Sequence, residues 1–116
     1  MSDHLLGINV STRGDTVVVT PTGDIDLTGS PQLKVELRKA VGTTPPPRRL
    51  VIDLSAVSYM DSSGLATLVE ALQTSRKGGY KMAVCGLQPR VRAIFDIAKL
   101  AMVFTIVPSL DQALAS

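Results

Sequence analysis

The chain has 116 residues, of which 45% are hydrophobic and only 3% aromatic, so one domain with an aliphatic core is expected over residues 1–116. The net charge of +2 is too small to favour nucleic acid or an anionic membrane as a partner. No apolar run approaches the roughly 20 residues of a membrane span, and no signal-peptide pattern opens the sequence. The sequence therefore predicts a cytoplasmic protein without membrane insertion. Cys85 and His4 are the only residues of their types, which excludes an intrachain disulfide framework and the usual zinc sites.

The first part of the chain predicts a β-hairpin. Met1–Leu5 is expected to be a loose end. Ile8 and Val10 alternate with polar residues, which is typical of an edge strand, and Thr16–Thr20 is a β-branched strand. The Arg13–Asp15 segment between them, with glycine at its centre, predicts a tight turn.

Two acidic residues follow the second strand. Pro21 is expected to end regular pairing or to mark an edge. Asp24 and Asp26 are two residues apart, so in an extended segment their side chains point to the same side. Two interpretations stay open here: solvated loop aspartates, or a pair of which one lies near the serine loop described below and shapes its electrostatics.

The rest of the chain alternates helices and strands. Ser30 as N-cap and Pro31 at the first helical position predict a helix that Gly42 ends. A proline-rich connector follows at residues 45–47. The remaining expected elements are a buried central strand at 49–53, a helix that ends near Lys77, a buried strand at 81–85, a helix from Pro89, a strand at 103–107, and a short helix capped by Ser109 and running through Leu114. The order β-β-α-β-α-β-α-β-α predicts an α/β fold with a mostly parallel, mixed central sheet flanked by helices.

The most informative stretch is Ser58–Leu65, which joins the central strand to the following helix. Asp61, Ser62 and Ser63 are all good N-cap residues, and an ordinary structural cap is one interpretation. The other is a phosphate site, because two hydroxyls lie at the positive end of a helix dipole. Gly64 in the first turn favours it by indicating that another group approaches the backbone closely. The loop also follows the carboxyl end of a strand, where open α/β sheets place their sites.

Several enzymatic alternatives fail on their sequence requirements. A serine hydrolase needs a base beside its nucleophile, and the only histidine is near the first residue. Phosphate-binding glycine loops and dinucleotide fingerprints are missing, so no cofactor is expected. A receiver domain phosphorylated on Asp53 would open with one strand and carry a lysine after its last strand. Here two strands open the chain, and Val107-Pro108 stands at the lysine position. We therefore expect a protein that is not an enzyme.

The Ser58–Leu65 loop closely resembles the phosphorylation loop of the STAS family, specifically of the bacterial anti-sigma factor antagonists. Gly23–Asp26 resembles the acidic motif after that family's second strand, and Phe95–Leu100 resembles its late helix. The matches run in order over about residues 5–115, which implies a single STAS domain.

The resemblance also implies a partner-switching function. The unphosphorylated antagonist would bind an anti-sigma factor that is also a serine kinase, and so release the sigma factor. Phosphorylation would abolish binding, and a serine phosphatase would reset the switch. The implied acceptor is Ser62, with Ser63 as the alternative. The residues expected to contact the partner are Asp24, Asp26, Asp61, Ser63 and Gly64. An adaptor subunit of a signalling scaffold or lipid-transport complex, without a phospho-switch, stays open as the alternative function.

Overall fold

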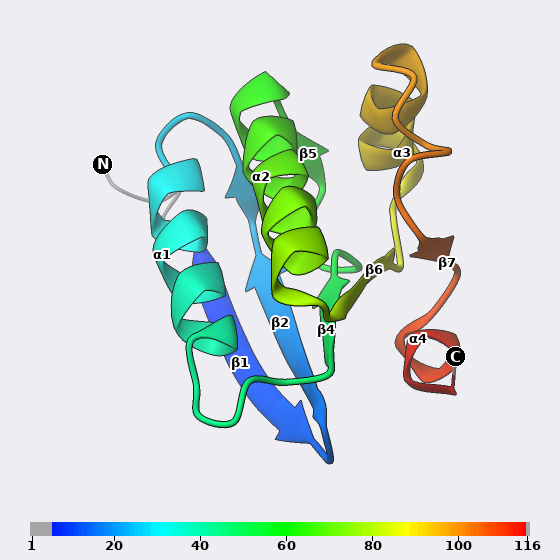
Figure 1. Cartoon of the computed structure of the whole chain (residues 1–116). Helices are drawn as coiled ribbons and strands as arrows, with labels where there is room; N and C mark the ends of the chain where they lie inside the picture. Colours follow the sequence, from blue (N-terminus) through cyan, green and yellow to red (C-terminus); the bar gives the residue numbers. More distant parts are fainter. Residues whose placement is uncertain (1–5, 116) are drawn as a thin grey trace.

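A computed structural model describes residues 6–115 of the chain (Figure 1). The loose end expected over Met1–Leu5, which includes His4, lies outside the described residues. The strands are β1 (Gly7–Arg13), β2 (Thr16–Thr22), β3 (Asp24–Ile25), β4 (Arg49–Asp53), β5 (Tyr59–Met60), β6 (Lys81–Cys85) and β7 (Ile106–Val107). The helices are α1 (Ser30–Val41), α2 (Ser62–Gly78), α3 (Pro89–Ile97) and α4 (Leu110–Ala115).

The central sheet has the strand order β1-β2-β4-β6-β7. β1 and β2 form an antiparallel hairpin, and the pairs β2–β4, β4–β6 and β6–β7 are parallel. The expected tight turn is present, because Gly14 adopts a φ of 64° between Arg13 and Thr16, which pair with each other. The prediction of a mixed, mostly parallel sheet is therefore confirmed.

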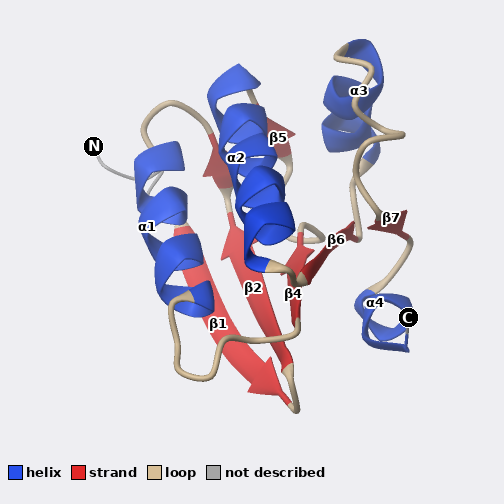
Figure 2. Ribbon diagram, viewed as in Figure 1, coloured by secondary structure: helices blue, strands red, loops and turns tan. Residues whose placement is uncertain are grey.

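Helices cover both faces of this sheet (Figure 2). Val17 and Val19 of β2 belong to the large core beneath α1, α2 and α3, whereas Val18 between them packs with Ala113 of α4 on the opposite face. This alternation follows from the two-residue period of a strand. Leu68 of α2 is completely buried, and removing such a side chain from water contributes about 1.5–3 kcal/mol.

Two expected strand limits are wrong. The last strand was predicted over residues 103–107, but β7 contains only Ile106 and Val107. The preceding residues form turns instead, because the backbone N–H groups of Val103 and Phe104 both donate to the carbonyl of Leu100. Of these residues, Phe104 is buried and packs edge-on against Phe95, with ring centroids 5.1 Å apart, whereas Val103 is exposed. Conversely, β2 continues through Pro21 to Thr22, although its pairing with β4 ends at Val19. Pro21 is tolerated because that part of β2 pairs only with β1.

A second, two-stranded sheet positions the candidate site. β3 and β5 are parallel, with Asp24 opposite Tyr59 and Ile25 opposite Met60. Ile25 and Met60 are both completely buried. The sequence did not predict these two strands, which bring the acidic segment after β2 beside the serine loop before α2.

Candidate functional site at the start of α2

Asp61 begins helix α2 as its N-cap residue. Its backbone is extended, with φ −105° and ψ −172°, and its carboxylate Oδ1 accepts hydrogen bonds from the backbone N–H groups of Ser63 (2.9 Å) and Gly64 (3.2 Å). The backbone N–H of Leu65 donates to the Asp61 carbonyl, 3.0 Å away. The expected cap is present, and it uses Asp61 among the three cap-type residues.

Ser62 is the first residue of α2, and its side chain is exposed. Within the part of the chain that the structure describes, its hydroxyl makes no hydrogen bond, whereas its neighbour Ser63 makes several. The hydroxyl of Ser62 therefore reaches solvent at the positive end of a helix that is 17 residues long.

Ser63 is held inside a small hydrogen-bond network. Its Oγ donates to Asp61 Oδ1 at 2.5 Å and lies 3.1 Å from the Oγ of Ser30. The Ser30 hydroxyl in turn donates to the backbone carbonyl of Asp26 at 2.6 Å. Each hydroxyl has a single proton, which Ser63 donates to Asp61 and Ser30 donates to the Asp26 carbonyl. The Ser30–Ser63 contact is therefore a hydrogen bond only when one of the two serines donates to the other instead. The network makes the Ser63 hydroxyl far less available than that of Ser62.

The charge of the cap is stabilised by the same contacts. The hydrogen bond from the Ser63 hydroxyl, helped by backbone N–H groups, holds the pKa of Asp61 below its ordinary value of 3.8 against the opposing effect of burial. Asp61 is consequently ionised at neutral pH, directly before the exposed serine.

The two aspartates of the acidic segment have different local roles. Asp24 Oδ1 accepts a long hydrogen bond, 3.4 Å, from the hydroxyl of Ser58 in the serine loop. Asp26 Oδ1 instead accepts from the backbone N–H groups of Thr28 (3.0 Å) and Gly29 (2.9 Å), just before α1. The structure thus brings Asp24 beside the loop through β3 and β5, while Asp26 stabilises the turn that leads into α1.

The start of α1 differs from the prediction. Ser30 was expected to be the N-cap, but it is the first helical residue and Gly29 occupies the cap position without a side-chain hydrogen bond. Ser30 is buried, because its hydroxyl turns back to Asp26 and meets Ser63. Sequence reasoning therefore missed Ser30 as a member of the site, and its cap-like position before Pro31 concealed that role.

Gly64 was expected to mark a close approach, and the group that approaches belongs to the chain itself. A Cβ atom at position 64 would lie 2.6 Å from the carbonyl oxygen of Ile25 and 2.7 Å from Cγ of Met60. Gly64 is buried, so its effect on a partner surface would be indirect, through the close fit of α2 against β3 and β5.

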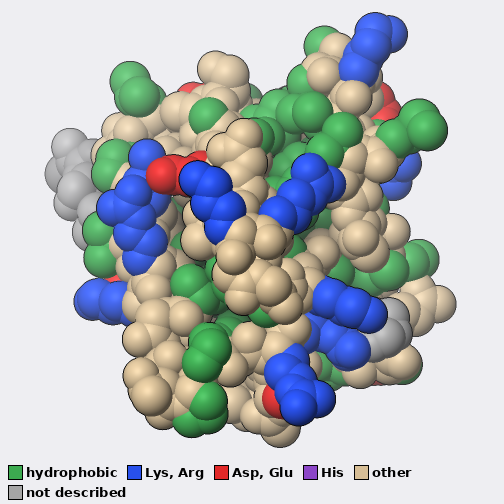
Figure 3. Space-filling model, viewed as in Figure 1, with side chains coloured by type: hydrophobic (Ala, Val, Ile, Leu, Met, Phe, Trp, Pro, Cys, Tyr) green, Lys and Arg blue, Asp and Glu red, His purple; other side chains and the backbone are tan. Residues whose placement is uncertain are grey.

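Apolar side chains are exposed near this helix start. Leu27, which precedes α1, is 76% exposed, and Tyr59 of β5 is 45% exposed. The sequence did not predict either residue as part of the site. The signal that could have indicated Tyr59 was an aromatic side chain directly after Ser58 in the loop. An open groove between α1 and α2 extends from this end, lined among others by Leu27, Val35 and Ser63. The space-filling view shows basic and apolar side chains gathered over the two helices (Figure 3).

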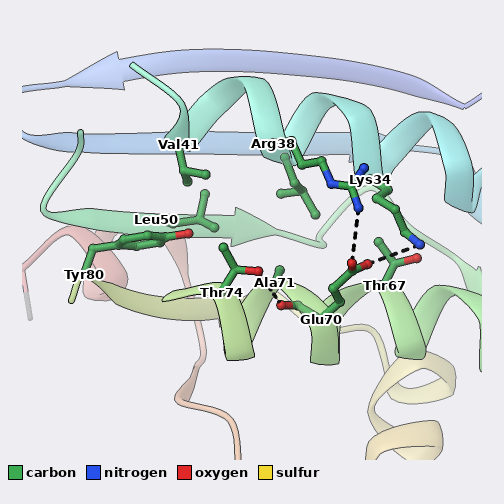
Figure 4. Close-up of a pocket in the computed structure, with 10 residues that line it drawn as sticks. Lys34, Arg38, Val41, Leu50, Thr67, Glu70, Ala71, Thr74 and Tyr80 are labelled. Atoms are coloured by element: carbon green, nitrogen blue, oxygen red, sulfur yellow. Dashed lines mark hydrogen bonds and ion pairs between the residues drawn. The ribbon is translucent and has the colours of Figure 1, made fainter. Parts of the chain in front are cut away.

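Farther along the two helices, an exposed ion-pair cluster spans them. Lys34 and Arg38 of α1 both reach Glu70 of α2, with N···O distances of 3.2 and 3.3 Å (Figure 4). The hydrogen bond from Lys34 lowers the pKa of Glu70 below its ordinary value. This cluster is exposed and links α1 with α2, which carry Ser30 and Ser63 at their first turns.

The described residues contain no group of His, Cys, Asp and Glu side chains arranged to hold a metal ion. None of the helices within residues 6–115 is long and apolar enough to cross a membrane. What the arrangement offers chemically is the exposed hydroxyl of Ser62, next in sequence to the ionised carboxylate of Asp61, with Leu27 and Tyr59 exposed on neighbouring segments.

The fold and this loop define an α/β domain that presents a serine where a helix begins. Residues 7–113 match the family model of the STAS domain, and the chain belongs to that family. The anti-sigma-B factor antagonist of Listeria monocytogenes is 33% identical over 92 residues, which cover 79% of this chain and 79% of that protein. The structure of an anti-sigma factor antagonist from Mycobacterium paratuberculosis matches with a TM-score of 0.88 at 29% identity, covering 98% of this chain and 95% of that one. The phosphorylated form of the Bacillus cell fate determinant SpoIIAA has the same fold, with a TM-score of 0.72 at 16% identity over 94% of this chain and 97% of its own.

Proposed function

We propose that this chain is an anti-sigma factor antagonist that works in the cytoplasm as a phosphorylation-controlled binding module and is not itself an enzyme. Its unphosphorylated form binds an anti-sigma factor that is also a serine kinase, and phosphorylation of Ser62 ends the complex. The observation that carries the proposal is the exposed Ser62 hydroxyl at the first position of α2, which makes no hydrogen bond to any of residues 6–115. The names of its relatives support the class of function.

Ser62 is a better acceptor than Ser63 for a structural reason. Phosphorylation of Ser62 breaks no hydrogen bond among the described residues, so the domain should stay folded. A phosphoryl group on Ser63 would replace the proton that now reaches Asp61 and would enter the contact with Ser30. The fold is compatible with phosphorylation, since SpoIIAA has a phosphorylated form.

The phosphate would remain a strong, unneutralised charge on the surface. A phosphoserine carries roughly −1.5 to −2 charges at neutral pH. The N–H groups of Ser63 and Gly64, which would otherwise bind a phosphate, are already occupied by Asp61. Asp61 is itself ionised and adjacent in sequence, so the helix dipole only partly offsets the added charge.

Such a charge is enough to switch binding without a conformational change. The partner surface that accepts a neutral hydroxyl would meet a dianion, and an unpaired charge at an interface costs on the order of 2–5 kcal/mol. That corresponds to a loss of affinity of roughly 30-fold to several thousand-fold. Exposed Leu27 and Tyr59 would supply apolar contact area around the switch. The half-buried Asp24, Asp26 and Asp61 would supply its polar rim. A serine phosphatase would restore the binding form.

The test compares three variants, at Ser62 and Ser63, in the presence of the native partner. The protein is used to pull its kinase partner from the native host, and its intact mass is then measured after incubation with ATP and magnesium. Ser62→Ala should bind the kinase and stay unphosphorylated, whereas the matched control Ser63→Ala should gain one phosphate. Ser62→Asp should fold normally and bind at least about 30-fold more weakly.

Two outcomes would count against the proposal. A phosphate on Ser62→Ala would move the acceptor elsewhere, most simply to Ser63. Co-purification with a transporter ATPase instead of a kinase, with no phosphate on the protein, would favour an adaptor without a phospho-switch.

A further inference from the structure

β1 forms one edge of the central sheet, and its outer side carries no other strand among residues 6–115. The strand is seven residues long and mostly exposed. Soluble proteins usually protect such an edge with proline, a charged side chain, a bulge or a covering segment. From Gly7 to Thr12 this strand has neither a charged residue nor a proline, and it pairs with β2 residue by residue without a bulge.

The hairpin register identifies which backbone groups point outward. Arg13 and Thr16 flank the two-residue turn, so they form a hydrogen-bonded pair. Counting away from the turn along β1, every second residue is likewise hydrogen-bonded to its partner in β2. Ser11 and Asn9 thus bond inward to β2. The N–H and C=O groups of Thr12, Val10 and Ile8 point away from the sheet.

These outward groups are self-complementary about Val10, the middle residue of β1. In an antiparallel pair of two β1 strands related by a two-fold axis at Val10, each Ile8 lies opposite the other copy's Thr12. The two Val10 residues then face each other. Each of these pairs can exchange both of its N–H···O bonds, because all of their backbone groups point outward. The two Arg13 side chains lie at opposite ends, so no like charges meet.

The side chains fit the same register. Ile8, Val10 and Thr12 share one face of the strand, and Ile8 packs against the core. Val10 continues that apolar face but is 41% exposed within one copy of the chain. Opposite a second Val10 it would form a β-branched cross-strand pair, which stabilises antiparallel sheets. We propose that β1 is a homodimerisation edge, through which two copies of this chain join their sheets into one continuous sheet.

This proposal does not depend on the phospho-switch, because the pairing edge is formed by β1 and the switch by the start of α2. The contact area is small, so the dimer is expected to dissociate on dilution. The test is the molar mass of the full chain, measured by light scattering or sedimentation over a range of concentrations. The wild type should shift from the mass of one chain to that of two chains as its concentration rises.

A matched pair of lysine substitutions tests the edge itself. Val10→Lys places two like charges opposite each other across the two-fold axis and should keep the protein monomeric at concentrations where the wild type is dimeric. Val35→Lys on α1 is the control, because Val35 is similarly exposed, at 48%, and lies on a helix. It should still dimerise. Far-UV circular dichroism would verify that both variants are folded.

A second measurement needs no variant. Amide hydrogen exchange at Ile8, Val10 and Thr12 should slow as the wild-type concentration rises. Exchange at Asn9, which bonds inward to Thr20, should not change. A wild type that remains monomeric at every soluble concentration would overturn the proposal. So would a dimer that survives Val10→Lys, or one without protection of these three amides.

Discussion

Replacing Gly64 by alanine tests whether the contact between α2 and β3 positions the serine loop. The added Cβ would lie 2.6 Å from the carbonyl oxygen of Ile25, 2.7 Å from Cγ of Met60 and 2.8 Å from Cγ2 of Ile25. One of these atoms is backbone and two belong to completely buried side chains, so none can rotate freely away. The helix must therefore move relative to the small β3–β5 sheet.

Two opposing effects determine how much Gly64→Ala changes the free energy of unfolding. Alanine is a better helix former than glycine by about 0.5–1 kcal/mol. Overpacking of a filled core costs about 1–3 kcal/mol, and the backbone obstacle places this site at the upper end. The packing cost exceeds the helix gain, so the free energy of unfolding should fall by about 2 kcal/mol. For a domain of this size that lowers Tm by roughly 10 °C.

Urea or thermal unfolding followed by circular dichroism would measure this loss of stability. Gly78→Ala in the same helix is the control, since a Cβ there meets only the ring of Tyr80, which can shift. That variant should stay within about 0.5 kcal/mol of the wild type. If Gly64→Ala were as stable as the wild type, the close contact with Ile25 would not constrain the start of α2, and its role in positioning Ser62 would be refuted.

Two further predictions concern ionisable side chains. Asp61→Ala removes the N-cap and should lower the free energy of unfolding by about 1 kcal/mol at pH 7. Because the pKa of Asp61 is lowered in the folded state, its stabilising effect is complete above the unfolded value near 3.8 and is lost as the pH falls through the folded value. Melts at pH 7 and pH 3 should therefore show the difference from the wild type shrinking in acid, and a constant difference would contradict the assignment. Burial, with a smaller contribution from Asp53, raises the pKa of Cys85 to about 12. A thiol reagent at pH 8 should thus leave the native protein unlabelled and modify it only in denaturant, as intact mass would show; rapid labelling of the native protein would contradict the buried placement.

Much of the fold could be predicted from local patterns. The valines of β2, the glycine of the Arg13–Asp15 turn and the apolar stripe of α2 each identify an element, because strand and helix periods differ. The cap at Asp61 was predictable for the same reason: its hydrogen bonds reach only two and three residues along the chain. Ser109 likewise caps α4 as expected, accepting a hydrogen bond from the backbone N–H of Gln112.

Contacts between distant segments could not be predicted. β3 and β5 have two residues each, and neither shows a strand pattern alone, since their stability comes from pairing with each other and burying Ile25 and Met60. The expected last strand was too long because Val103 and Phe104 look like strand residues, whereas their backbone N–H groups form turns with the carbonyl of Leu100 and Phe104 packs against Phe95.

The sequence by itself determined that a serine follows a helix cap, because capping is a matter of residue type and short spacing. Only the tertiary structure decided which of two adjacent serines is free. The Ser63 hydroxyl donates to Asp61 and lies beside Ser30, which belongs to a different helix and is 33 residues away in sequence, whereas Ser62 is exposed.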